Sequence, residues 1–163
     1  MACNAVPVFA DVDPVTGNLD PVSVARRITR RTRAILAVHL IGAPAPAPVE
    51  LRELAERRGV PLLEDCAQAW LARYPDGRLA GTAGAASCFS LQQWKHITCG
   101  DGGLVVTEDL ELARRIRLFA DKGWPRIDST LLVLDWNEQY TEAHVDAIAQ
   151  AVTAVHAAQS GQR

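Results

Sequence analysis

The sequence predicts an α/β fold in which helices flank a mostly parallel β-sheet. Short apolar segments typical of buried strands alternate with amphipathic helical segments, which is the rhythm of β-α-β units. The 163 residues are enough for one domain with a real hydrophobic core. Hydrophobic residues make up 48% of the chain and charged residues 22%, which is ordinary for a globular protein and argues against disorder.

Local signals place the individual elements. Asp20 is a good helix cap with Pro21 at the first helical position, and Gly59 is a C-terminal stop for a second helix. Segment 33–39 is typical of a short strand buried on both faces. Thr107 is expected to cap a third helix. We therefore expect strands at 6–12, 33–39, 60–64, 87–92 and 103–107, a hairpin turn at 74–77, and helices at 21–29, 49–58, 109–122 and from 141 onward.

Charge and cysteine usage exclude several classes of function. The formal net charge of −2 gives no basic surface for nucleic acid or anionic lipid. No apolar run approaches the length of a membrane span, and no signal-peptide pattern is present, so we expect no membrane partner. The four cysteines form no C-x-x-C pair and have no histidine at zinc-finger spacing. We expect a cytoplasmic protein with reduced thiols and no metal site.

The segment from Cys88 to Leu104 carries the strongest chemical signal. It places Lys95 among apolar and uncharged polar residues beside a glycine-rich turn. Burial disfavours the ammonium form, so such a lysine can act as an amine nucleophile. The alternative is that Lys95 extends its charge into solvent at a strand end. Asp65, at the end of the 60–64 strand, is open to two interpretations as well, a functional carboxylate at the edge of a parallel sheet or a helix cap.

Taken together, these residues suit an aldehyde cofactor. A Schiff base needs an amine, and a pyridine ring needs a carboxylate that keeps its nitrogen protonated so that the ring acts as an electron sink. Lys95 and Asp65 supply those two groups at neighbouring strand ends. Ser90 adds a hydroxyl that can donate a hydrogen bond to a phosphate.

The chain resembles the DegT/DnrJ/EryC1/StrS family of pyridoxal-phosphate sugar aminotransferases. The resemblance runs from Val6 to about Arg126 and rests on the segments PVFADVDP, VHLIG, EDCAQA, CFSLQQWKHITCGDGG, VVTED and DKGWPR. It implies that Lys95 forms the Schiff base with pyridoxal 5'-phosphate and then moves the proton. It also implies that Asp65 pairs with the pyridinium nitrogen, that Gln68 contacts the ring and that Ser90 binds the phosphate. The implied reaction transfers an amino group from glutamate or glutamine to a keto-sugar or keto-cyclitol.

The resemblance also sets the expected architecture. It implies part of the large domain of a fold-type I aminotransferase at residues 5–126, joined directly to the family's C-terminal helical tail at 130–158. A homodimer or a companion chain would supply missing parts of the site. Trp70 stands where many members carry His, which leaves one substrate contact open. His39 and His96 match family positions, with packing and catalysis both open. The alternative function is a non-catalytic truncated remnant that binds the cofactor weakly or not at all.

Overall fold

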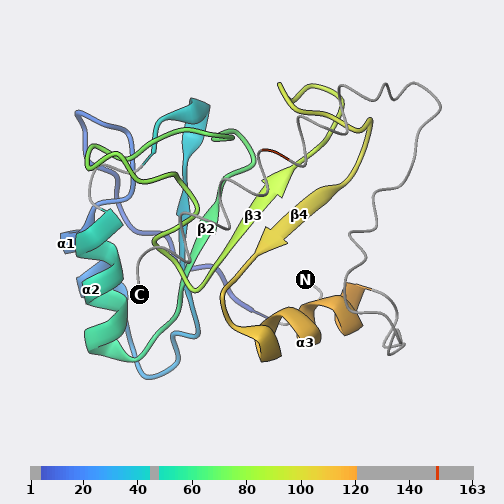
Figure 1. Ribbon diagram of the computed structural model, residues 1–163. Helices are drawn as coiled ribbons and strands as arrows, with labels where there is room; N and C mark the ends of the chain where they lie inside the picture. The colour runs from blue at the N-terminus through green and yellow to red at the C-terminus, as the bar shows by residue number, and fades with distance from the viewer. Residues whose placement is uncertain (1–4, 45–47, 121–149, 151–163) are drawn as a thin grey trace.

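The computed structural model describes residues 5–44, 48–120 and 150. A four-stranded sheet with the order β1-β2-β3-β4 forms its centre (Figure 1). The elements are α1 (Pro21–Arg27), β1 (Ile35–Val38), the 3-10 helix η1 (Leu40–Gly42), α2 (Pro48–Arg58), β2 (Leu62–Asp65), β3 (Ala86–Ser90), β4 (Gly103–Val106) and α3 (Leu110–Ala120). Within these ranges no helix is long and apolar enough to cross a membrane.

The sheet is mostly parallel, as the sequence predicts. β1 pairs with β2 and β2 with β3 in parallel, whereas β4 returns antiparallel to β3. The carboxyl ends of β1, β2 and β3 therefore meet at one edge of the sheet. α3 lies beyond the opposite edge (Figure 1).

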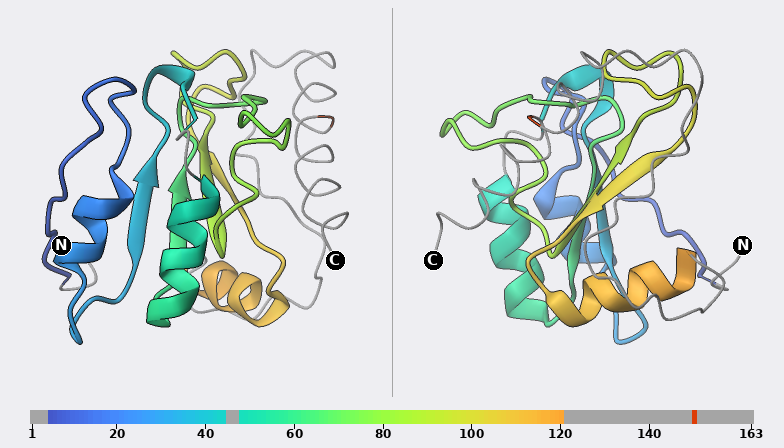
Figure 2. Two further views of the ribbon diagram at one scale, coloured as in Figure 1. Left: turned by 90° about the vertical axis from the view of Figure 1, so that its left-hand side faces the viewer. Right: turned by 45° about the vertical axis from the view of Figure 1, so that its right-hand side comes forward.

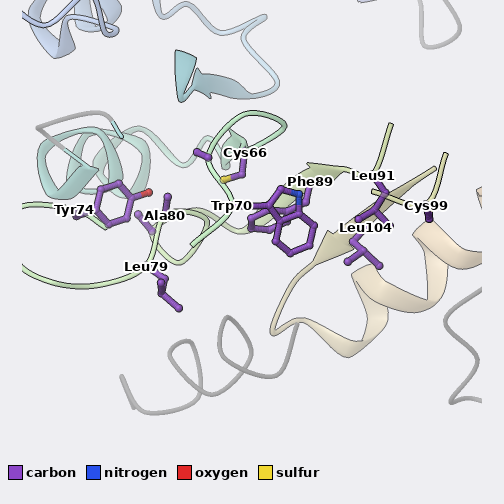
Figure 3. Packing of buried hydrophobic residues seen from close by; sticks show 11 residues of the cluster. Cys66, Trp70, Tyr74, Leu79, Ala80, Phe89, Leu91, Cys99 and Leu104 are labelled. Atoms are coloured by element: carbon purple, nitrogen blue, oxygen red, sulfur yellow. The ribbon is translucent and has the colours of Figure 1, made fainter. Parts of the chain in front are cut away.

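One face of the sheet is closed by packing. α2 packs on β2 and against α1 (Figure 2). Two buried clusters fill this side. The first joins α1, α2, β1 and β2, and its buried members are Val24, Ile35, Ala37, Leu51, Leu54, Ala55, Val60 and Leu62. The second lies under the segment between β2 and β3, where Trp70, Phe89 and Leu104 are central (Figure 3).

The other face of the sheet is open within the described residues. Burial alternates along β1, so that Leu36 and Val38 are exposed while their neighbours are buried. Val105 of β4 is exposed on the same face, because the register places it in line with Cys88, Asp65 and Val38. The prediction that segment 33–39 is buried on both faces is wrong here, since no described segment covers this side.

The helix signals are largely confirmed. The Asp20 carboxylate accepts the backbone N–H groups of Val22 and Ser23, with Pro21 in the first turn. Gly59 ends α2 with a φ of +62°, a left-handed conformation that glycine adopts without strain.

The predicted hairpin turn at 74–77 is also present. Backbone hydrogen bonds of Tyr74 and Gly77 close it, next to an isolated antiparallel bridge.

Two local predictions are wrong. Segment 6–12 is not a strand, because only Val12 forms a β-bridge, to Leu19. The cap of α3 is Asp109, whose carboxylate accepts the N–H groups at positions 111 and 112; Thr107 instead donates its hydroxyl to the Ala85 carbonyl. The predicted helix from 141 and the tail at 130–158 lie outside the described residues, apart from Gln150.

Candidate active site

The site residues predicted from the sequence lie at the carboxyl edge of the parallel strands. Asp65 is the last residue of β2, and Ser90 is the last residue of β3. Lys95 lies in the loop that follows β3, and Gln68 lies in the loop that follows β2. In open α/β sheets, ligands bind in the crevice beyond the carboxyl ends of the strands, which is this edge.

Asp65 and Ser90 share the open face of the sheet. Asp65 is in register with Cys88, and Ser90 follows two residues later on the same side of β3. One carboxylate oxygen of Asp65 accepts the Ala67 N–H at 2.9 Å. Burial and the nearby Asp65 carboxylate raise the pKa of the Cys88 thiol. Asp65, Cys88 and Ser90 therefore lie together on a face that no described segment covers.

The loop after β3 is tied back to Ser90. The Ser90 hydroxyl accepts the Gln92 N–H at 3.3 Å, and the Lys95 N–H donates to the Gln92 carbonyl at 2.8 Å. Lys95 itself is half-buried. The turn thus brings the lysine back toward the strand end.

Trp70 joins the loops after β2 and β3. It is 5% exposed, its indole N–H donates to the Ser90 carbonyl at 2.9 Å, and its ring lies 4.6 Å from the Phe89 ring centroid (Figure 3). The Trp70 carbonyl lies 3.4 Å from Nε2 of His96. The position that the sequence left open as a substrate contact is occupied by a core side chain that anchors Ser90.

Gln68 is tied to the loop after β1. Its side-chain oxygen accepts the Ile41 N–H at 2.7 Å, while the rest of the residue is exposed. All three parallel strands therefore contribute a loop to this edge, and side-chain hydrogen bonds link the loops in sequence.

A buried carboxylate, Glu64, lies directly behind this edge. It is 1% exposed and accepts hydrogen bonds from His39 at 2.9 Å and from the Tyr74 hydroxyl. Three backbone N–H groups complete the shell, those of residues 81, 83 and 84. Burial alone raises the pKa of Glu64, but the hydrogen bonds from His39, Tyr74 and Gly84 outweigh it and leave the pKa below its ordinary value. The sequence did not predict this role for Glu64, because its donors come from distant segments.

One cluster contains three side chains of the kinds that bind metal ions, His39, Glu64 and Cys66. Their ligand atoms lie within 4.8 Å of one another, and all three residues are buried. However, the Glu64 carboxylate already accepts five hydrogen bonds. In addition, the pKa of the Cys66 thiol is far above its ordinary value, mainly because of burial and further because of the nearby Glu64 and Asp65 carboxylates. We therefore interpret the cluster as a structural hydrogen-bond network, which gives His39 a packing role.

A surface cavity of about 500 Å³ lies away from this edge. It is lined by the start of α3, part of α2 and the loop before β3, around Arg52, Glu56 and Asp109. None of the predicted site residues lines it. Side-chain chemistry, and not cavity volume, therefore locates the candidate site.

The donor set at the carboxyl edge fits an aldehyde-bearing pyridine cofactor with a phosphate. A carboxylate suits a protonated ring nitrogen, a hydroxyl suits a phosphate oxygen, and an amine suits the aldehyde. Asp65, Ser90 and Lys95 provide one of each on adjoining strand ends.

Comparison with known proteins agrees with this chemistry. The model of the DegT/DnrJ/EryC1/StrS aminotransferase family matches residues 1–132. L-glutamine:2-deoxy-scyllo-inosose aminotransferase of Streptomyces paromomycinus is 53% identical over 116 residues, covering 71% of this chain and 27% of the relative. dTDP-3-amino-3,4,6-trideoxy-alpha-D-glucose transaminase of Streptomyces venezuelae is 46% identical over 123 residues, or 75% of this chain and 32% of the relative.

A solved structure extends the likeness to three dimensions. NtdA of Bacillus subtilis with bound cofactor PMP superposes with a TM-score of 0.71 at 25% identity, covering 96% of this chain and 35% of that one. The chain thus spans only about a quarter to a third of the length of the relatives it matches. The match to the family model nevertheless covers most of the chain, and the chain belongs to the DegT/DnrJ/EryC1/StrS aminotransferase family.

Proposed function

We propose that this chain is the cofactor-binding part of a pyridoxal-phosphate aminotransferase that acts on a keto-cyclitol or keto-sugar. The observation that carries the proposal is the presence of Asp65, Ser90 and Lys95 at one edge of the sheet in a member of this family. The relative that transfers an amino group from L-glutamine to an inosose supports a cyclitol acceptor and a glutamine or glutamate donor.

Each residue has a role that its chemistry supports. The Asp65 carboxylate holds a proton on the ring nitrogen, and the Ser90 hydroxyl donates to the phosphate. The Lys95 amine binds the aldehyde and later takes and returns the proton that moves during transfer. When bound, the cofactor supplies the electron sink that makes this proton acidic.

The proposal extends to partners and setting. A homodimer or a companion chain would cover the open face around Leu36, Val38 and Val105, where parallel sheets normally carry a second layer. We place the protein in the cytoplasm, which Cys66 and Cys88 favour because neither forms a disulfide.

Borohydride trapping tests the proposal. The chain contains two lysines, Lys95 and Lys122, so the trapped residue can be assigned by peptide mapping. Incubation with pyridoxal phosphate followed by reduction should leave one phosphopyridoxyl group on Lys95. Lys122→Arg is the matched control and should keep the label, whereas Lys95→Arg should lose it. Equal labelling of both lysines, or no label, would contradict the proposal.

A second function, a non-catalytic remnant, is favoured by the exposed apolar residues of the open face. Such a surface promotes self-association when nothing covers it. Light scattering over a concentration series distinguishes the two. Concentration-dependent aggregation without any Lys95 label supports the remnant, and a defined species that takes the label supports the enzyme.

A further inference from the structure

Ile41 has an unusual backbone conformation at the candidate site. Its φ and ψ are 56° and 27°, in the left-handed region, and its side chain is 85% exposed. For a β-branched residue this conformation is a true outlier, because its Cβ comes too close to the backbone. Because strain of this kind persists only where surrounding contacts fix it, the contacts of Ile41 are informative.

The loop around Ile41 packs closely against Gln68 and is hydrogen-bonded to it. The Ile41 N–H donates to Oε1 of Gln68 at 2.7 Å, and the Ala43 N–H closes the turn onto the Leu40 carbonyl at 3.1 Å. Gly42 follows with a φ of +74°, and a Cβ there would lie 3.2 Å from the Gln68 carbonyl oxygen. Two consecutive left-handed residues thus aim one N–H group at one side-chain amide.

This contact decides which end of the Gln68 amide meets a ligand. An N–H donor can pair only with the amide oxygen, so the oxygen faces Ile41 and the NH₂ group is the end left for other partners. We propose that Ile41 is a positioning residue whose N–H fixes Gln68 as a hydrogen-bond donor toward an acceptor oxygen of the bound cofactor. The identity of that ligand rests on the proposed function.

Amide hydrogen exchange in the ligand-free chain tests the contact itself. The Ile41 amide is on an exposed loop, so its protection should depend on Gln68. Gln68→Ala should accelerate its exchange about tenfold, while Gln68→Glu, which keeps an acceptor, should preserve the protection. The Lys95 amide, bonded to Gln92, is the reference. Equal acceleration at Lys95, or no acceleration at Ile41, would overturn the assignment.

Titration with pyridoxal phosphate tests the donor role. Gln68→Glu should weaken binding about tenfold although Ile41 stays protected, because the NH₂ donors are replaced by a carboxylate. Replacing residue 41 by the α-hydroxy acid analogue of isoleucine deletes only the N–H and should weaken binding several-fold. Unchanged affinity in Gln68→Glu would overturn the donor role. If the unaltered chain keeps Ile41 protected but binds no pyridoxal phosphate, the proposed function and the ligand fail while the Ile41–Gln68 contact stands.

Discussion

Glu64 and Asp65 are adjacent carboxylates on β2 with opposite surroundings. Glu64 points to the closed face, is 1% exposed and accepts five hydrogen bonds. Asp65 points to the open face, is half-buried and accepts the N–H of Ala67. A strand reverses side-chain direction at each residue, so neighbours in sequence can have unrelated roles. The closed face uses the Glu64 carboxylate for structure, whereas the open face leaves the Asp65 carboxylate available for the ligand that we propose.

The closed-face network explains why a charge is tolerated in the core. An isolated buried carboxylate is very costly, and donors must offset the lost hydration. Glu64 gathers donors from His39 just after β1, from Tyr74 and from the loop before β3, so it connects three segments that are distant in sequence. The backbone N–H of His39 donates to the backbone carbonyl of Asp65 at 3.0 Å, so the residues of the network are also bonded to the candidate site.

Glu64→Ala should have the largest effect on stability. It leaves five donors without their acceptor, including His39 and Tyr74, and removing one member of such a buried set costs about 3–5 kcal/mol. Urea unfolding measures the loss. Glu53→Ala is the matched control, because its exposed pair with Arg57 contributes about 0.5 kcal/mol or less. A Glu64 variant as stable as the Glu53 variant would contradict a structural role.

Acidification should produce the same loss in part. Burial alone raises the pKa of Glu64, yet its hydrogen bonds bring the folded-state pKa below the ordinary value of 4.5. A carboxylate with a lowered pKa contributes stability that is fully present above 4.5 and disappears as the pH falls through the folded-state pKa. Urea midpoints measured from pH 7 downward should fall in this window. The Glu64→Gln variant should be less stable at neutral pH, and its urea midpoint should fall less steeply on acidification. A midpoint that falls as steeply as in the unaltered chain would contradict the assignment.

Ser87→Ala should have a smaller effect and the opposite sign. The Ser87 hydroxyl is fully buried on the closed face and is the side-chain group without a hydrogen-bond partner within the described residues. Removing an unsatisfied polar group should stabilise the chain by about 1 kcal/mol. Thermal unfolding measures it, with Ser90→Ala as the control that lies on the open face. A destabilised Ser87→Ala variant would show that the hydroxyl has a partner.

The sequence predicts locally determined elements better than contacts between distant segments. Asp20, Gly59 and the apolar segments that became β1 and β2 act through local geometry, so their elements are confirmed. Glu64 escaped prediction because its donors come from residues 39 to 84, and no local pattern reveals such partners. Segment 6–12 alternates like a strand, but pairing needs a neighbouring edge, and local alternation does not provide one.

The chemistry of the candidate site residues is visible in the sequence for the opposite reason, and their roles stay predictions. Amine, carboxylate and hydroxyl chemistry is visible in Lys95, Asp65 and Ser90 themselves, whereas their arrangement depends on parallel pairing of β2 with β3. Trp70 shows the limit of this approach. Its sequence position left a substrate contact open, and only the structure shows that its ring and its indole N–H lie in the core beside Phe89.

Asp65→Asn should have the smallest effect on folding and separates the two carboxylates most directly. The asparagine oxygen can still accept the Ala67 N–H, so the free energy of unfolding should change by about 0.5 kcal/mol or less. The affinity for pyridoxal phosphate should nevertheless fall about tenfold or more, because a neutral amide does not hold a proton on the ring nitrogen as a carboxylate does. Urea unfolding and a pyridoxal phosphate titration of the same preparation measure both quantities. A variant that loses stability as Glu64→Ala does, but binds the cofactor as before, would place Asp65 with the structural carboxylates, and the difference between the two faces would no longer account for the site.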